Sequence, residues 1–256
     1  MLLEGIKFLN KKLKNDIIKG IMKDIREDDL MINGAKIMQY VDGYCFTSDA
    51  VFLANFIECS NNENILELGT GSGIISLIIA LKKMPGKIKA IEIQERYALL
   101  AQRNIELNKL ENIIEIECAD LKTFRKKDTY DIVIMNPPYF KKQAGLQNAH
   151  KEKEISRREI CCELEDIFMS ASDNLKNKGH FYIVLKADRV QEVFDNAKKY
   201  NFAIKRMLLI KPTKEKDVDS IVFDMVKNGG YACKIQSIYV YENDGQLSKE
   251  ALKFYE

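Results

Sequence analysis

Apolar residues repeat along the chain with two different spacings, and these spacings predict the order of the secondary-structure elements. Runs rich in β-branched residues, typical of buried strands, occupy 64–68, 88–93, 112–118, 130–135 and 179–186. Stretches with helical spacing separate them at 72–84, 95–108, 120–126 and 161–175. Such alternation predicts a parallel sheet that is covered by helices on both faces.

The two ends of the chain depart from this alternation. Three strand-like stretches with short loops between the later ones, 203–210, 219–226 and 233–241, predict antiparallel additions at the sheet edge. Residues 1–28 have apolar residues at helical spacing with lysines between them, which predicts a basic amphipathic helix. We expect this helix to pack on the protein, with RNA contact or membrane-surface binding as less favoured alternatives. The α/β domain then spans 29–256.

Two short signals stand between the helix and the first strand of the alternation. Asn33-Gly34 lies between apolar residues and predicts a hairpin over 30–38, because both positions of the tight turn need a positive φ. Residues 47–59 predict a short helix with Thr47 or Ser48 as its N-cap.

Composition narrows the class of protein. The chain has 256 residues, 46% hydrophobic, with a net charge of +2, so any nucleic-acid contact must use local basic patches. No apolar run is long enough to span a membrane, and Lys7, Lys11, Lys12 and Lys14 interrupt any signal-peptide core. We therefore expect a soluble, cytoplasmic protein. Six cysteines without a CxxC pair and only two histidines argue against a metal site and a histidine triad.

A glycine-rich loop follows the strand at 64–68. Gly69, Gly71 and Gly73 alternate there, and glycine lets the backbone take a positive φ and approach a ligand closely. A dinucleotide site of the G-x-G-x-x-G type would need glycine at position 74, which is Ile74.

Acidic residues stand at the ends of three successive predicted strands. They are Glu67 before the loop, Glu92 at the end of the next strand, and Asp120 after the third. Each acid alone is more often a helix cap or a solvated charge. Their order at successive strand ends favours a shared cofactor site, in which Glu92 can accept bonds from both ribose hydroxyls.

The G-x-G-x-G loop with Glu67 resembles the first motif of class I S-adenosylmethionine-dependent methyltransferases. This resemblance implies a Rossmann-like α/β fold with a seven-stranded, mostly parallel sheet, an antiparallel edge, and a short N-terminal helix and hairpin. It also implies that the loop holds the amino-acid part of S-adenosylmethionine beside Glu67. Asp120 would meet the adenine amine, and Ile93 and Leu121 would be further cofactor contacts.

Asn136-Pro137-Pro138-Tyr139 follows the buried strand at 130–135. The lone pair of an exocyclic amine is delocalised, so an Asn oxygen and a backbone carbonyl that accept its N–H bonds can hold it for attack. Proline fixes φ, and an aromatic ring offers a stacking face. Such dipeptides are also common in ordinary turns. With the glycine loop, the motif predicts methyl transfer to an amine, with Asn136 also near the cofactor.

From about residue 30 onward the chain resembles the bacterial methyltransferases that modify adenine-37 N6 in valine tRNA. The resemblance is carried by the hairpin, the glycine loop and four further segments: 43–51, 136–140, 156–160 and 164–166, together with Gly145 and Asn148. It implies a tRNA partner, a monomer or weak dimer, and closure of Thr47 and Asp49 over the methionine end of the cofactor. Relatives carry Ala-Arg-His-Glu where this chain has Ser156-Arg157-Arg158-Glu159. Arg158 in place of histidine leaves the RNA target open.

Basic side chains near the Asn-Pro-Pro-Tyr motif fit a polyanionic substrate. Lys141, Lys142, Arg157 and Arg158, with Phe140, are the candidate RNA contacts, and phosphate contacts of this kind position a nucleic acid. A second cluster follows at 205–216. Either cluster alone is better explained as a solvated surface, and it is the position of the first cluster beside the motif that favours RNA contact.

Three other functions stay open. A release-factor glutamine methyltransferase would ordinarily carry a helical N-terminal domain, for which about sixty residues are too few. A DNA or ribosomal RNA amine methyltransferase is the next alternative, although a DNA enzyme would need means to flip a base out of a duplex. A non-catalytic RNA-binding protein is least favoured, because the acids, glycines and Asn136 are all present.

Overall fold

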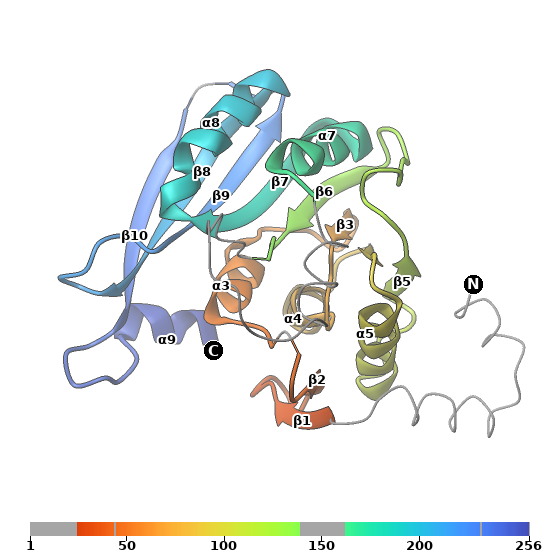
Figure 1. Cartoon of the computed structure of the whole chain (residues 1–256), viewed down its shortest axis with the longest axis vertical. Helices are drawn as coiled ribbons and strands as arrows, with labels where there is room; N and C mark the ends of the chain where they lie inside the picture. Colours follow the sequence, from red (N-terminus) through yellow and green to blue (C-terminus); the bar gives the residue numbers. More distant parts are fainter. Residues whose placement is uncertain (1–24, 44, 139–161, 231, 256) are drawn as a thin grey trace, which may run out of the picture.

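An eight-stranded sheet with the order β10-β8-β9-β7-β6-β3-β4-β5 runs through the protein (Figure 1). The computed structural model describes residues 25–43, 45–138, 162–230 and 232–255. The strands of this sheet are β3 (Asn64–Leu68), β4 (Lys87–Glu92), β5 (Ile114–Cys118), β6 (Tyr130–Met135), β7 (Leu175–Lys186), β8 (Phe202–Thr213), β9 (Ser220–Lys227) and β10 (Lys234–Tyr241). The five strands from β7 to β5 are parallel, so the mostly parallel α/β fold is confirmed.

The predicted count of seven strands is one too low. β9 is antiparallel to both β7 and β8, as expected for the edge, but β10 pairs parallel with β8. β9 ends beside the start of β8, where Lys227 pairs with Phe202. The chain that leaves β9 therefore reaches the free edge of β8 near the first residues of β8. From there β10 can extend along that edge only in the same direction as β8, which makes the pairing parallel.

The chain reverses its direction of travel across the sheet next to β3. It passes from β3 outward to β4 and β5, and then returns to β6 on the other side of β3. The connections that leave β3 and β6 therefore run to opposite sides. Open α/β sheets bind ligands in the crevice that forms at such a point, outside the carboxyl ends of the strands.

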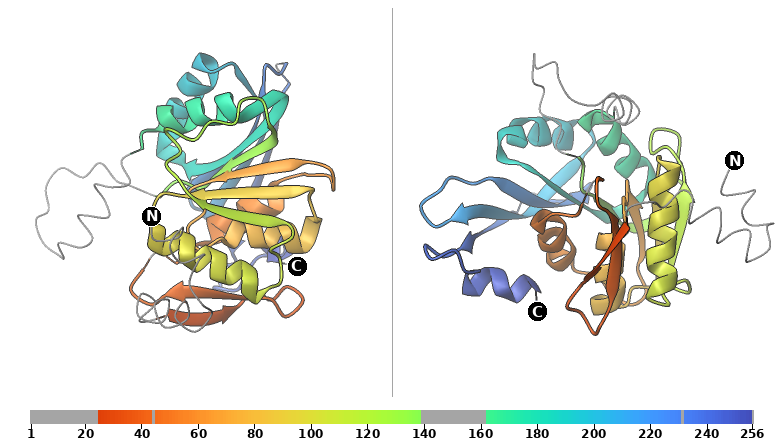
Figure 2. Two further views of the ribbon diagram at one scale, coloured as in Figure 1. Left: turned by 90° about the vertical axis from the view of Figure 1, so that its right-hand side faces the viewer. Right: turned by 60° about the horizontal axis from the view of Figure 1, so that its bottom comes forward.

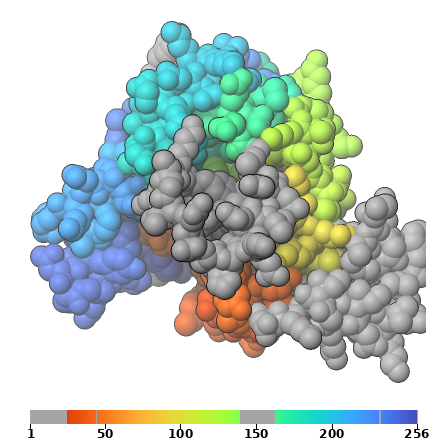
Figure 3. All heavy atoms as spheres, viewed as in Figure 1, coloured from red at the N-terminus to blue at the C-terminus, as the bar shows by residue number. Residues whose placement is uncertain are grey.

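Helices cover both faces of the sheet, and each face has its own core (Figure 2). On one face lie α3 (Ser48–Phe56), α4 (Ile74–Lys83), α5 (Glu95–Leu107) and α9 (Lys249–Tyr255), and on the other lie α7 (Leu164–Asn174) and α8 (Val190–Lys199), preceded by the short 3₁₀ turn η1 (Ala187–Arg189). Phe52 and Phe168 are fully buried, one in each core. In Figure 3 the last strands and α9 form one flank of the molecule, and the N-terminal hairpin forms another.

The predicted helix at 120–126 is wrong. The segment makes a single turn, in which Asp120 Oδ1 accepts a bond from the Lys122 amide at 2.8 Å. Lys126 N donates to Asn174 Oδ1 of α7 at 2.6 Å. Phe124 is its only buried residue, so a helix here would have no apolar face to place on the sheet.

The N-terminal hairpin is confirmed, but it begins earlier than predicted. Strands β1 (Ile25–Asp29) and β2 (Lys36–Tyr40) pair antiparallel, and Asn33 and Gly34 have φ of 49° and 72° in the loop between them. The predicted helix over 1–28 is therefore wrong at its C-terminal end, because pairing with β2 outweighs the helical spacing of Ile25. Residues 1–24 lie outside the described part of the chain. No helix within the described ranges is long and apolar enough to cross a membrane.

Candidate active site

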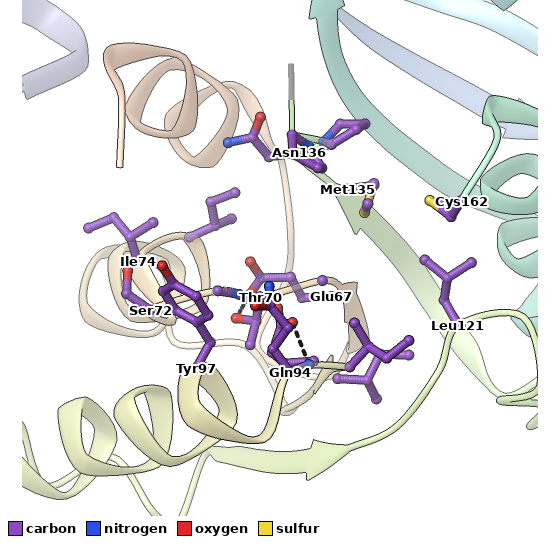
Figure 4. A pocket seen from close by; sticks show the side chains of 18 of the residues that line it. Glu67, Thr70, Ser72, Ile74, Gln94, Tyr97, Leu121, Met135, Asn136 and Cys162 are labelled. Atoms are coloured by element: carbon purple, nitrogen blue, oxygen red, sulfur yellow. Dashed lines mark hydrogen bonds between the residues drawn. The ribbon is translucent and has the colours of Figure 1, made fainter. Parts of the chain in front are cut away.

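A pocket of about 360 Å³ opens at the carboxyl ends of β3, β4, β5 and β6. The glycine loop forms one wall, and Asn136 lies across from it (Figure 4). The two prolines that follow Asn136 also line the pocket. The predicted site residues that line the pocket are Thr47, Glu67, Gly69, Gly71, Glu92, Ile93, Asp120, Leu121, Asn136, Pro137 and Pro138. The switch point thus gathers side chains from segments spread over about ninety residues.

Some predicted residues are placed elsewhere. Tyr139, Phe140, Lys141, Lys142, Arg157 and Arg158 lie outside the described residues. Asp49 is buried at the start of α3, where its carboxylate lies 3.6 Å from Lys186 Nζ and accepts a bond from Ser220 Oγ at 3.3 Å. It is not among the residues that line the pocket, whereas Thr47, two residues earlier, is. Gly73 lies behind the loop, at the N-cap of α4.

Glu67 is a buried carboxylate with partners from its own loop. The residue is 2% exposed, and its Oε2 accepts bonds from Thr70 Oγ1 at 2.8 Å and from both the amide and the hydroxyl of Ser76. Burial raises the pKa of Glu67 to about 7, against the opposing effect of these hydrogen bonds. The carboxyl group is therefore poised to titrate near neutral pH, where a cationic ligand would favour its ionised form.

Glu92 connects the glycine loop to β4. Its Oε2 accepts a bond from the Gly71 amide at 2.9 Å, and its Oε1 accepts one from the Gln94 amide at 2.9 Å. Burial raises the pKa of Glu92 as well, with the backbone bonds acting against it. Gly71 has φ of 57°, a conformation that a residue with a side chain adopts only under strain. This contact fixes the backbone of the loop at the place where a ligand must approach it.

An apolar slot lies beside the two later acids. Ile93 is 41% exposed although it is large and apolar, and it faces the pocket with Leu121. Asp120 stands between Ala119 and Leu121, and its side chain holds the turn through the Lys122 amide. A flat, apolar ring fits between such side chains, with a carboxylate at its edge for an exocyclic amine.

Asn136 is the unusual polar group of the site. Its Oδ1 is buried and has no hydrogen-bond partner, and no other buried side-chain nitrogen or oxygen of the described residues is in this state. A buried amide oxygen without a partner costs about 1–3 kcal/mol. The pocket wall therefore offers a strong acceptor to any N–H donor that enters.

Several lining residues were missed from the sequence, among them Gln94, Tyr97, Met135 and Cys162. Cys45 and Phe46 also line the pocket, within the segment 43–51 that carries the family resemblance. Tyr97 sits in the first turn of α5, and its helical position alone resembles that of an ordinary core residue. Cys162 follows the undescribed segment, and burial raises the pKa of its thiol to about 11, so it is a neutral thiol at physiological pH. No group of His, Cys, Asp or Glu side chains suited to a metal is found in the described ranges.

The second basic cluster does not form one surface. Arg206 Nε donates to the buried Asp224 Oδ2 at 2.7 Å, and its guanidinium lies 4.5 Å from the Phe56 ring centre. It therefore balances a buried charge in mid-strand β8. Lys211, by contrast, lies near the end of β8 and donates to the Lys214 carbonyl at 2.7 Å.

The pocket fits a cationic nucleoside-type cofactor. Three acids, a glycine-lined loop and an apolar slot surround it, and S-adenosylmethionine combines an ammonium, a sulfonium and an adenosine. The fold and this site define a class I S-adenosylmethionine-dependent methyltransferase. More particularly, the chain belongs to the methyltransferase small domain family, whose model matches residues 47–201.

Comparisons with known proteins agree with this class. The chain is 26% identical over 206 residues to a tRNA1(Val) (adenine(37)-N6)-methyltransferase of Bacteroides thetaiotaomicron, covering 80% of each chain. It is 21% identical to the protein of the same name from Vibrio campbellii, covering 88% of this chain and 98% of that one. Its fold is similar to a predicted O-methyltransferase from Agrobacterium tumefaciens (TM-score 0.65, 20% identity, covering 81% and 95%). It is also similar to M. jannaschii TYW2 in complex with AdoMet (TM-score 0.53, 20% identity, covering 80% and 86%).

Proposed function

We propose that this protein transfers a methyl group from S-adenosylmethionine to the exocyclic N6 amine of an adenine in RNA, in tRNA next to the anticodon. The observation that carries this proposal is the buried Oδ1 of Asn136, which has no hydrogen-bond partner among the described residues. The relatives from Bacteroides thetaiotaomicron and Vibrio campbellii support the choice of tRNA adenine, because their names state that substrate.

The chemistry required of the chain is positioning. S-adenosylmethionine supplies a methyl group attached to a positively charged sulfur. Asn136 Oδ1 accepts one N–H of the target amine, and a carbonyl of Pro137 or Pro138 is suited to the other. Holding both N–H bonds fixes the nitrogen and favours a pyramidal geometry, in which its lone pair is less delocalised into the ring.

The proton that the amine loses needs no dedicated base. No histidine is found among the described residues that line the pocket. Asp120 is bound to the Lys122 amide, and Glu67 and Glu92 are held by the glycine loop and its neighbours. The site therefore acts by orientation and by exclusion of water, and the proton can leave to solvent after methyl transfer.

A glutamine side chain is the competing substrate, because a carboxamide also presents two N–H bonds to Asn136. The names of the relatives favour adenine over glutamine as the substrate.

The test uses purified protein and methyl-labelled S-adenosylmethionine. Small RNA and total protein from cells that lack the gene are offered separately, and labelled RNA is digested to nucleosides. We expect the label in tRNA as N6-methyladenosine, and no label with the Asn136→Ala variant. Label in protein with none in RNA would overturn the proposal and support a glutamine methyltransferase.

A further inference from the structure

Asn104 of α5 and Asn108, the C-cap residue of α5, hydrogen-bond to the outer edge of β2 as a neighbouring strand would. Asn108 Oδ1 accepts from Lys36 N at 3.0 Å, and its Nδ2 donates to Lys36 O at 2.7 Å. Asn104 Oδ1 accepts from Met38 N at 2.7 Å, and its Nδ2 donates to Met38 O at 3.0 Å. The hairpin therefore lies against α5 (Figure 2), where four hydrogen bonds join the two asparagine side chains to the backbone of β2.

The two spacings match, which explains why asparagines four apart can do this. Four residues of an α-helix rise about 6 Å, and two residues of a strand span about 6.7 Å. Lys36 and Met38 are two apart, so their backbone groups point to the same edge of β2, away from β1. An unpaired strand edge exposes polar groups that need partners, and the two amides supply them.

Asn104 alone makes a further contact that reaches the pocket. Its Nδ2 also donates to the carbonyl oxygen of Ser72 in the glycine loop at 2.9 Å, and the residue is 0% exposed. The loop rests on α5 at the next residue too. A Cβ at Gly73 would lie 3.4 Å from the Cβ of Ala101, one helical turn before Asn104.

The hairpin also leads into a second part of the pocket wall. Gln39 follows Met38 in β2, and its Oε1 accepts a bond from the Phe46 amide at 2.9 Å. Phe46, with Cys45 and Thr47, lines the pocket. The 45–47 part of the wall is bound to Gln39, the residue after Met38, and the glycine loop contains Ser72. The Asn104 amide binds the backbone of both Met38 and Ser72.

We propose that Asn104 is a positioning residue, which sets the distance between the glycine loop and the 45–47 segment and so determines cofactor affinity. It touches neither cofactor nor substrate in this role. Asn108 provides a matched control, because it holds the same edge of β2 without any bond to the glycine loop.

The experiment measures binding of S-adenosylhomocysteine by calorimetry, together with thermal unfolding of the full chain. We expect Asn104→Ala to weaken binding about tenfold, the effect of one lost hydrogen bond. Asn108→Ala should leave binding within about twofold, although both variants lower the unfolding midpoint. Asn104→Asp keeps the acceptor for Met38 N but places an oxygen against the Ser72 carbonyl, and it should weaken binding at least as much.

Two results would overturn the proposal: equal weakening by the Asn104 and Asn108 variants, or a lower midpoint for Asn104→Ala with unchanged affinity. If Asn104→Ala does not stay folded, Asn104→Ser decides the same comparison. Binding of S-adenosylhomocysteine needs no methyl acceptor, so this test is independent of the substrate proposed above. In assays with the methyl acceptor, the weaker cofactor binding of Asn104→Ala should appear as a higher KM for the methyl donor, with kcat within about threefold of wild type.

Discussion

The two walls of the pocket differ in whether their buried polar groups have hydrogen-bond partners. On the glycine-loop side, Glu67 and Glu92 accept hydrogen bonds from Thr70, Ser76 and the Gly71 and Gln94 amides. On the other side, Asn136 Oδ1 is buried and has no hydrogen-bond partner among the described residues. The first wall keeps its shape without a ligand, whereas the second carries an acceptor that gains its bond only when a donor arrives.

This difference separates binding from chemistry. A wall whose polar groups are satisfied is preorganised, so a ligand does not have to order it. An unsatisfied acceptor makes the ligand-free protein less stable, and it recovers that free energy only with a correctly placed N–H. Such a group can contribute more to the transition state than to ground-state binding, which is the condition for catalysis.

The largest expected effect is that of Asn136→Ala. We expect methyl transfer to fall by about 10³-fold, as for the loss of one preorganised hydrogen-bonding group at a reacting atom. Affinity for S-adenosylhomocysteine should stay within about threefold, and the free energy of unfolding should stay equal or rise by about 1 kcal/mol. Single-turnover kinetics, calorimetry and denaturant unfolding measure the three quantities.

Asn174→Ala is the matched control for this variant. Asn174 is a fully buried asparagine whose amide is satisfied by Lys126 N, Phe124 O and Ser170 O. It should lose about 2 kcal/mol of stability while methyl transfer is unchanged. If Asn136→Ala were destabilised as much as Asn174→Ala, the contrast between the two walls would be wrong.

The second expected effect is a pH dependence that arises from Glu67. Its pKa is about 7 in the folded protein against an ordinary value of 4.5, so the folded state holds the proton more tightly. The associated stability is fully present below pH 4.5 and is lost as pH rises through about 7, a change of about 3 kcal/mol in the ligand-free protein. Glu67→Gln should remove this slope, which denaturant unfolding between pH 5 and about pH 8 measures.

Cofactor affinity should change in the opposite direction. The ionised carboxylate attracts an ammonium, so S-adenosylhomocysteine should bind about tenfold more tightly at pH 8 than at pH 6. The pKa of Glu92 is also raised by burial, so the difference between wild type and Glu67→Gln is the informative quantity. If affinity depended on pH identically in wild type and Glu67→Gln, Glu67 would not be part of the cofactor site.

The spacing of apolar residues predicted most helices and strands, and it also predicted those site residues that lie at the ends of parallel strands. β3 and β6 have the predicted bounds because each is a short apolar run between polar loops. Glu67, Glu92 and Asp120 came together because parallel strands place their carboxyl ends at one edge. The prediction of a helix at 120–126 was wrong, because this segment is hydrogen-bonded to Asn174 of α7, which lies about fifty residues later in the sequence.

Contacts between distant segments could not be predicted in this way. Thr47 and Asp49 are two residues apart, yet Thr47 lines the pocket and Asp49 contacts Ser220, 171 residues away. Asn104 falls on the buried face of α5 with Leu100 and Ala101, but the sequence does not show that its amide binds Met38 and Ser72. Neither set of contacts has a signal in the spacing of apolar residues.

A smaller effect tests whether the glycine-loop wall is shaped for a ligand. Gly71 and Gly34 have φ of 57° and 72°, and a Cβ at either would meet no atom within 4 Å. Replacing either by alanine should cost about 1 kcal/mol of stability, because both positions are left-handed. Only Gly71 lines the pocket, so Gly71→Ala alone should weaken S-adenosylhomocysteine binding, by about tenfold. Equal binding by the two variants would mean that the loop does not approach the cofactor.

The smallest effect concerns the apolar slot, where the ligand should cover a side chain that the free protein leaves exposed. Ile93 and Leu107 are 41% and 38% exposed, but only Ile93 lines the pocket. Truncation to alanine at either position should change stability by less than about 1 kcal/mol, because both side chains are already partly in water. Ile93→Ala should weaken S-adenosylhomocysteine binding about fivefold, the effect of burying a few methylene groups against a ring, and Leu107→Ala should not. Calorimetry on both variants decides this. An unchanged affinity for Ile93→Ala would mean that the adenosine lies elsewhere along the wall, and that the acids alone hold the cofactor.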